Sequence, residues 1–402
     1  MELKSGYKQT DVGVIPEEWK VLSFADVFNV SAGGDVDPKR SAPEPDETHC
    51  YPIYSNALTN RGLYGYCSYA DHQAGSITIT ARGTLGVAQY RDHAFTAIGR
   101  VLVLHPKRTI DGRYFAEVIN NRVKFAIEST GVPQLTAPQI STYWLPFPHV
   151  TEQRAIAAAL GDVDVLIGAQ EDLIAKKRDL RQAVKQSLLM GRTRLPGFSG
   201  AWESKRLGEM GYFSKGRGLA KEELSSSGTL PAIPYTAIYT DHDEVIQTQQ
   251  IRYFAKSAAG LEVVNSPHVL IASSSNMLEN VGKASAYVGG ADVAVGGDIL
   301  LYKTAMDVRF LSYLLSTYTH RKRIVFLSQG STIRHVYVST LRTYEVTTPS
   351  TPEQTAIADV LSDMDAEIAA LEMRLAKTHD LKQGMMQELL TGRTRLVGRG
   401  AA

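Results

Sequence analysis

The chain contains an internal duplication, and this feature constrains its fold more than any other. Residues 152–195 align without a gap to residues 353–396, at a constant offset of 201 residues, and 24 of the 44 aligned positions are identical. Both copies begin with Glu-Gln-x-Ala-Ile-Ala and end with Gly-Arg-Thr-Arg-Leu. The sequence before each copy is more divergent, although short similar runs follow in the same order. The chain therefore alternates a variable region, a constant region, a second variable region and a second constant region.

The two constant regions are predicted to form long helices. Their mostly apolar positions recur at alternating steps of four and three residues: Ile156, Leu160, Val163, Ile167, Gln170 and Ile174, and then Ile357, Leu361, Met364, Ile368, Leu371 and Leu375. This spacing is typical of a coiled-coil seam, although an amphipathic helix packed on a globular core would share it. Two equivalent helices in one chain are expected to pack antiparallel, related by a pseudo-two-fold axis.

Capping residues give the expected bounds of these helices. Thr151 and Thr351 are candidate N-caps, and Gly191 and Gly392 are candidate C-terminal stops. Each helix would then run for about 39 residues, or roughly 58 Å, and would act as a rigid spacer between the variable regions. The predicted domains are two variable domains and two spacer helices, at residues 1–150, 151–196, 197–350 and 351–402.

The variable regions are predicted to be compact α+β domains. Each contains short β-rich runs followed by one helical stretch, without a regular alternation of strand and helix. The expected strands are 51–54, 77–80, 101–104, 233–235, 269–271 and 299–302, and the expected helices lie at about 114–127 and 310–326.

Composition and missing motifs exclude several function classes. Forty-three Lys and Arg residues balance 42 Asp and Glu residues, so the net charge of +1 neither supports nor excludes a nucleic-acid partner. No apolar run is long enough to cross a membrane, and the polar N-terminus does not resemble a secretory signal. Cys50 and Cys67 are interpreted as reduced thiols of a cytoplasmic protein. No phosphate-binding P-loop, zinc-binding His-Glu-x-x-His or Cys-x-x-Cys, or Gly-x-Ser-x-Gly elbow is present, so no catalytic residue, metal or cofactor is expected in this chain.

Three further runs complete a recognisable pattern. They are Tyr51–Asn56, Thr80–Gly86, and Pro133–Thr136 leading into Pro146–Pro148. Each run is a weak signal alone. Together with the two Glu-Gln segments and the two Gly-Arg-Thr-Arg-Leu ends, in this order, the runs form a specific pattern. Over essentially its whole length, the chain resembles the specificity (S) subunit of bacterial type I restriction–modification enzymes.

This resemblance implies a division of labour. The variable regions would be target recognition domains, each reading one half of a bipartite, interrupted site in double-stranded DNA. The helices would separate them and dock two methylation subunits, which would carry S-adenosylmethionine and methylate adenine at N6. A restriction subunit would add ATP- and Mg²⁺-dependent translocation and cleavage. Because Thr80-Ala81-Arg82-Gly83 corresponds to Ala272-Ser273-Ser274-Ser275 in the second copy, the two half-sites would differ.

Candidate DNA contacts are side chains that can bond to base edges or phosphates. In the first variable region they are Arg82, in a glycine-bordered loop after a strand, and then Lys39, Arg40, Asn56, Arg61 and Gln134. In the second they are Lys215, Arg217, Asn276 and Arg334. The alternative for each is an ordinary solvated surface residue.

Several neighbouring features have two readings each. The Lys215–Gly218 run could bring a backbone amide near phosphate, or its glycines could serve a turn. Ser273, Ser274 and Ser275 could contact phosphate, although a polar turn is favoured. The arginines of the two Gly-Arg-Thr-Arg-Leu ends could touch DNA or a partner, but complementing the helix C-termini is the favoured role.

Two other function classes remain for comparison. A two-domain coiled-coil adaptor would bind proteins and show no DNA specificity. An enzyme in its own right, such as a fused methyltransferase, is disfavoured because the chain has no Asn/Asp-Pro-Pro-Tyr/Phe methylation motif.

Overall fold

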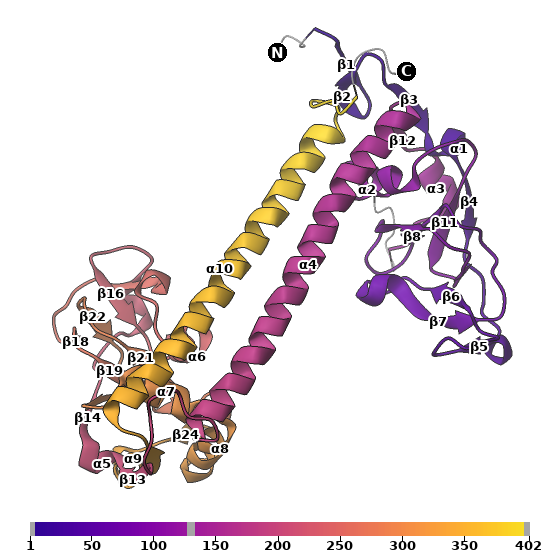
Figure 1. Ribbon diagram of the computed structural model, residues 1–402. Helices are drawn as coiled ribbons and strands as arrows, with labels where there is room; N and C mark the ends of the chain where they lie inside the picture. Colours follow the sequence, from indigo (N-terminus) through magenta and orange to yellow (C-terminus); the bar gives the residue numbers. More distant parts are fainter. Residues whose placement is uncertain (1–4, 127–132, 398–402) are drawn as a thin grey trace. The chain divides into compact units, whose positions relative to one another are not determined.

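The computed structural model describes residues 5–126 and 133–397 (Figure 1). The chain divides into two compact units: the first comprises Met1–Glu171 with Met373–Ala402, and the second comprises Asp172–Glu372. Each unit contains one variable region and part of both long helices. The fold is α+β with a repeated plan, as the sequence predicts.

The variable region of the first unit is built on two four-stranded sheets. The central sheet is antiparallel, in the order β4 (Phe28–Ala32), β11 (Val101–Pro106), β8 (Ser76–Thr80) and β9 (Ala88–Arg91). The other has the order β10 (Thr96–Ala97), β6 (Tyr51–Tyr54), β7 (Leu63–Cys67) and β5 (Ser41–Ala42). The remaining elements are β1 (Tyr7–Thr10), β2 (Gly13–Pro16), β3 (Lys20–Ser23), α1 (Phe24–Val27), η1 (Pro38–Arg40), η2 (Thr59–Gly62), α2 (Gly112–Arg122), α3 (Ala137–Ser141) and β12 (Trp144–Phe147).

Side-chain alternation along β11 explains why this sheet is buried on both faces. Leu102 and Leu104 pack in a core with the aromatic residues of α2, whereas Val101 and Val103 pack with residues of the second sheet. Successive side chains of a strand point to opposite faces, so one short apolar run serves two cores. Each fully buried aliphatic side chain of this kind contributes about 1.5–3 kcal/mol.

The variable region of the second unit repeats this plan. Its central sheet has the order β14 (Gly211–Lys215), β23 (Ile299–Thr304), β19 (His268–Ala272) and β21 (Ala284–Tyr287). A five-stranded sheet has the order β15 (Leu224–Ser225), β17 (Tyr253–Ala255), β16 (Leu230–Ile233), β22 (Val293–Val295) and β18 (Glu262–Val264). The remaining elements are β13 (Glu203–Arg206), α5 (Leu207–Met210), η3 (Lys221–Glu223), α6 (Ala237–Thr240), η4 (Thr248–Gln250), β20 (Ser274–Ser275), α7 (Val308–Leu315), α8 (Tyr318–Leu327), β24 (Arg334–His335), α9 (Val338–Arg342) and β25 (Glu345–Thr348).

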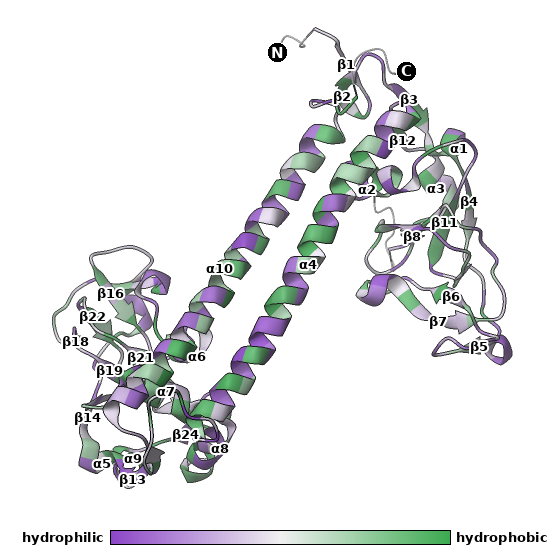
Figure 2. Cartoon of the chain, viewed as in Figure 1, coloured by the Kyte–Doolittle hydropathy of each residue, from purple (hydrophilic) through white to green (hydrophobic). Residues whose placement is uncertain are grey.

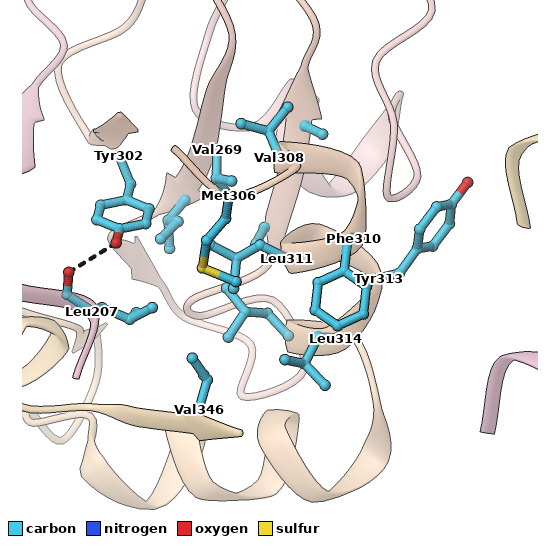
Figure 3. Close-up of a cluster of buried hydrophobic side chains, with 14 of the residues drawn as sticks. Leu207, Val269, Tyr302, Met306, Val308, Phe310, Leu311, Tyr313, Leu314 and Val346 are labelled. Carbon is cyan, nitrogen blue, oxygen red and sulfur yellow. Dashed lines mark hydrogen bonds between the residues drawn. The ribbon is translucent and has the colours of Figure 1, made fainter. Parts of the chain in front are cut away.

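The same alternation divides the cores of the second unit. Val269 and Ile271 of β19 face α7, whereas Leu270 packs with the five-stranded sheet. In the core beside α7, the Tyr302 hydroxyl donates a 2.8 Å hydrogen bond to the Leu207 carbonyl oxygen (Figure 3). This bond satisfies the polar end of a fully buried tyrosine.

The constant regions form α4 (Val150–Leu189, 40 residues) and α10 (Thr351–Leu389, 39 residues), close to the predicted length. In the first unit, the end of α10 shares a core with Ile156 and Leu160 at the start of α4. In the second unit, the end of α4 shares a core with Ile357 and Leu361 at the start of α10. Within each unit the helices therefore pack antiparallel, as predicted. Hydrophobic residues recur along both helices between hydrophilic ones (Figure 2).

The helix ends test the predicted caps. Gly191 and Gly392 stop the helices in the left-handed conformation, with φ angles of 64° and 69°. The amide of Arg192 donates to the Ser187 carbonyl, which completes a glycine C-cap, as predicted. The predicted N-caps are wrong: α4 begins at Val150 and α10 at Thr351, so Thr151 and Thr351 lie in the first turns.

The variable regions correct three other predicted bounds. Five of the six predicted strands are present. The strand predicted at 233–235 is wrong beyond its first residue, because β16 ends at Ile233 and the Pro234 carbonyl accepts the Ala237 amide in the turn into α6. The helix predicted at 114–127 ends at Arg122, and residue 127 lies outside the described part of the chain. The helix predicted at 310–326 is two helices, α7 and α8, which are separated at Ser316 and Thr317.

Candidate nucleic-acid interface

In the first unit, polar residues gather where strands of the central sheet end. β4 and β8 end, and β11 begins, at the same edge. Ala81 joins two further segments there: its amide donates to the Arg100 carbonyl, and its carbonyl accepts from the Leu135 amide. We call this assembly the first edge, comprising residues 32–34, 80–86, 98–101 and 133–135.

The second unit contains an equivalent edge. The Ser273 amide donates to the Asp298 carbonyl at 2.9 Å, and the Val336 amide donates to the Ser273 carbonyl at 2.8 Å. These two bonds repeat those of Ala81 in the first unit. We call this assembly the second edge, comprising residues 215–217, 272–278, 296–299 and 333–336. The repeated bonding pattern aligns Arg82 with Ser274 and Gln134 with His335.

A glycine allows close backbone packing at each edge. A Cβ atom on Gly33 would lie 2.4 Å from the Ile98 carbonyl oxygen, and one on Gly216 would lie 2.1 Å from the Gly296 carbonyl oxygen. The Gly216 amide donates to Ile299, and the Arg217 amide donates to Val295. Because both amides are occupied, neither is free to bind a phosphate.

Three predicted DNA-contact residues come together at the first edge. Asn56 Nδ2 donates to the Arg82 carbonyl at 3.0 Å. Arg82 donates from Nε and Nη2 to Gln134 Oε1, at 3.3 and 3.0 Å. Arginine has five N–H donors, so three remain on the exposed guanidinium of Arg82. The glutamine thus orients a side chain that can still donate two parallel bonds to a base.

The other candidates of the first unit lie outside the first edge. Arg61 has a left-handed φ of 51° and donates from Nε to Gln89 Oε1 at 3.1 Å. Lys39 is exposed on η1. Arg40, also on η1, donates from Nε to Ser68 Oγ at 3.3 Å, and its guanidinium lies 4.2 Å from the centre of the Tyr69 ring. The first edge therefore does not unite all six candidates.

Three of the four candidates in the second variable region lie exposed at the second edge. Lys215 Nζ is 3.8 Å from Asp298 Oδ1, and Arg217 and Asn276 are exposed. Arg334 is also part of this edge but is half-buried. Its Nε and Nη2 atoms donate three bonds to Ser328 and Val325 at the end of α8, which leaves the two Nη1 protons for another partner.

The prediction that Ser273, Ser274 and Ser275 form a polar turn is wrong. Ser274 and Ser275 form β20, which pairs antiparallel with Arg334 and His335 of β24. All three serines are buried. Ser275 Oγ accepts the Met277 amide at 3.0 Å, so it shapes the loop that follows.

The Glu-Gln motif fastens each variable region to a helix. Gln153 Oε1 accepts the amide of Asp111, the residue that caps α2, at 2.9 Å. In the second unit, Gln354 Oε1 accepts the amide of Asp307, which caps α7, at 3.2 Å. The duplicated glutamines therefore have the same structural role.

The glutamates of the motif bind the Gly-Arg-Thr-Arg-Leu ends. Arg194 donates two 2.6 Å bonds to Glu353, which is 2% exposed in its side chain. Arg395 likewise donates two bonds to Glu152, which also accepts from Trp19 Nε1 at 3.0 Å. These arginines therefore pair with glutamates instead of complementing the helix ends.

A buried carboxylate also ties the second variable region to α4. Glu244 accepts hydrogen bonds from Arg181 and Lys185. Burial alone would raise the pKa of Glu244, but the charges of Lys185 and Arg181 lower this pKa to about 2. Glu244 is therefore ionised and paired at neutral pH.

Sequence reasoning missed several residues of the two edges. Arg100 is exposed beside Arg82, His335 stacks against Tyr337, and Met277 is exposed next to Asn276. No sequence signal marks Arg100, because its equivalence to Asp298 comes from the repeated hydrogen bonds of Ala81 and Ser273 in the folded units. Residues 5–126 and 133–397 contain no group of three His, Cys, Asp or Glu side chains arranged to hold a metal ion. Within the same residues, no helix is long and apolar enough to cross a membrane.

Comparison with known proteins identifies the family to which this repeated architecture belongs. The family model for the type I restriction modification DNA specificity domain matches residues 16–176 and 200–377. The chain belongs to this family. Its two matched segments each contain one of the edges, and the chain is a specificity subunit of the type I restriction–modification class.

Relatives and solved structures agree with this assignment. The putative type I restriction enzyme MjaX specificity subunit of Methanocaldococcus jannaschii is 23% identical, over 98% of this chain and 97% of the relative. The putative type I specificity subunit S.MpnORF89P of Mycoplasma pneumoniae is 28% identical, over 41% of this chain and 51% of the relative. The crystal structure of the S subunit from M. genitalium has the same fold, with a TM-score of 0.62 and 14% identity, covering 97% of this chain and 98% of that one.

Proposed function

We propose that each edge reads one half of a bipartite, interrupted site in double-stranded DNA. The proposal rests on one observation: both units have the same backbone arrangement at this edge, but different side chains occupy its equivalent positions. Equivalent backbone bonds align exposed Arg82 and Gln134 in one unit with buried Ser274 and half-buried His335 in the other. The exposed polar side chains of the second edge are instead Lys215, Arg217 and Asn276. One frame that holds different donors and acceptors is suited to reading two different base sequences.

We also propose that the chain acts with catalytic partners. Two methylation subunits would bind the helices and carry S-adenosylmethionine, and they would methylate adenine at N6. A restriction subunit would supply ATP- and Mg²⁺-dependent cleavage. The family assignment supports this arrangement, and a similar structure with a TM-score of 0.51 comes from work on complex assembly in a type I system. The adaptor alternative, without DNA specificity, has no support from the family.

Exchange of one variable region tests independent reading of the half-sites. Residues 20–147, from the start of β3 to the end of β12, would be replaced by the matching segment of another family member. The complex with the methylation subunit should then methylate a site with one new half and one unchanged half. A reciprocal exchange of residues 203–348 is the matched control. Simultaneous change of both halves in either chimera would contradict independent reading.

We further propose that α4 and α10 set the gap between the half-sites. A seven-residue insertion at matched positions in both helices preserves the 4-3 seam and adds about 10 Å of helix. The gap should lengthen by about three base pairs, at roughly 3.4 Å each. A single alanine substitution at the same positions controls for local damage. An unchanged gap in an active complex would contradict the spacer role.

A further inference from the structure

The second edge exposes large apolar side chains, whereas those of the first edge, such as Leu85 and Leu135, are partly or fully buried. Met277, Leu278 and Ile333 are 51%, 52% and 51% exposed. At the first edge, the loop after β8 exposes Arg82, Gly83 and Thr84. We call Met277, Leu278 and Ile333 the apolar loop surface. Such exposure is costly in water, so a group of large apolar side chains at a binding edge indicates a contact.

Strand pairing brings the two segments of this surface together. Ser275 of β20 pairs with Arg334 of β24, so the next residues along the two antiparallel strands are Asn276 and Ile333. Met277 and Leu278 follow directly. The apolar loop surface is therefore one feature formed by two segments far apart in sequence.

Hydrogen bonds fix the backbone that carries these side chains. The Met277 amide donates to Ser275 Oγ, and the Asn280 amide donates to the Met277 carbonyl at 3.1 Å. Arg321 donates from Nη2 to the carbonyls of Glu279 and Val281, both at 2.8 Å. A fixed loop that keeps its apolar side chains outward is preorganised for a partner.

Charge identifies which part of DNA this loop can meet. Residues 276–280 contain no cation, and Glu279 is an exposed anion. Phosphates would be repelled by this loop, whereas a base edge in the major groove is uncharged. Lys215 and Arg217 lie at the neighbouring strand end of the same edge and can meet phosphates.

We propose that the apolar loop surface reads thymine 5-methyl groups in the major groove of the second half-site. This inference rests on the proposed function. Apolar side chains contact the thymine methyl group, and asparagine donates to and accepts from adenine. Asn276 beside Met277 therefore matches an A·T pair, whose major-groove edge presents the adenine N6 donor and N7 acceptor next to the thymine O4 acceptor and 5-methyl group. The second domain obtains part of its specificity from apolar contact, and the first obtains its specificity from Arg82 and Gln134.

Deoxyuridine substitution tests this assignment, because it removes the methyl group and leaves base pairing intact. The assembled methylation complex would be titrated with duplexes in which each thymine of the half-site read by residues 203–348 is replaced in turn. Domain exchange identifies that half-site. At least one replacement should weaken binding about fourfold, the fold-change that corresponds to about 0.8 kcal/mol for one buried carbon. Finding an A·T pair in the half-site does not test the proposal, because the adenine that is methylated already belongs to such a pair.

Matched variants connect the effect to the loop. In Met277→Ser and Leu278→Ser complexes, the affinities for thymine and deoxyuridine duplexes should become equal at the affected position. Phe326→Ser is the control, because Phe326 is 83% exposed on α8, outside the second edge. This control should keep the wild-type difference of about fourfold.

The outcomes separate this inference from the proposed function. A complex that methylates a split site but is insensitive to every deoxyuridine in the second half overturns the inference alone. A Met277→Ser variant that assembles poorly, but whose assembled fraction keeps the deoxyuridine effect, also overturns it by indicating a protein partner for the loop. A complex with no sequence preference contradicts the proposed function itself.

Discussion

Arg82→Ala should remove recognition of one base position without weakening DNA binding in general. Two of the five N–H donors of Arg82 go to Gln134, and three remain on an exposed guanidinium. This leaves enough donors for a bidentate bond to guanine, which is worth about 1–3 kcal/mol of discrimination. The wild-type complex should therefore distinguish the correct base from the others at that position by about 5-fold to 150-fold.

The assay is equilibrium binding of the assembled methylation complex to duplexes that differ at one base pair. The Arg82→Ala complex should bind all four bases equally at one position of the first half-site and should keep its base preferences at the remaining positions. Arg82→Lys should behave similarly, because lysine keeps the charge but cannot form the bidentate pair. Arg108→Ala is the matched control, since Arg108 is exposed beyond the opposite end of β11. An equal loss on every duplex, with Arg82→Lys restoring affinity, would show a phosphate contact and refute the reasoning.

Three further predictions concern the framework. Arg395→Met should destabilise the protein by about 3–5 kcal/mol, because it leaves the carboxylate of Glu152, 1% exposed, without its cation. Chemical denaturation should show a smaller loss when Glu152→Gln is added, and an additive loss would argue against the pair. Neither amide atom of buried Gln170 has a hydrogen-bond partner among the described residues, and the equivalent position is Leu371. Gln170→Leu should therefore stabilise by about 1–3 kcal/mol, and a lower melting temperature would contradict this. Burial, with help from a nearby arginine, lowers the pKa of His320 from 6.5 to about 4. The folded state thus binds fewer protons than the unfolded state, so the free energy of unfolding should fall as pH drops from 6.5 toward 4, by about 2 kcal/mol between pH 7 and pH 5. Urea unfolding of His320→Gln should show a smaller fall over that interval. An equal fall in the variant would rule out this histidine as the cause.

The sequence predicts the framework well because its signals are periodic and duplicated. The 4-3 spacing in both constant regions gives α4 and α10 nearly their observed lengths, and antiparallel packing follows from their equivalence. β-branched runs such as 77–80 give the central strands, because both faces of these strands are buried. Element ends are less certain: the predicted N-caps Thr151 and Thr351 lie inside their helices, and the second variable-region helix breaks at Ser316.

The candidate interface is only partly predictable, because it depends on contacts between segments far apart in sequence. Arg82 and Gln134 are separated by more than 50 residues, and only the folded sheet brings their side chains together. The same contacts show that Arg334 uses three donors on its own unit and that Arg194 binds Glu353. No periodic pattern in the sequence reports which donors are already occupied.

Mapping of N6-methyladenine across a genome tests the central claim most directly. The chain would be expressed with its methylation subunit in a host free of other adenine methylation, beside a control that lacks the chain. The account predicts one split, asymmetric motif that appears only when the chain is present. An active methylation subunit that forms a stable complex with the chain, yet produces no motif, would contradict the claim that this protein confers DNA specificity.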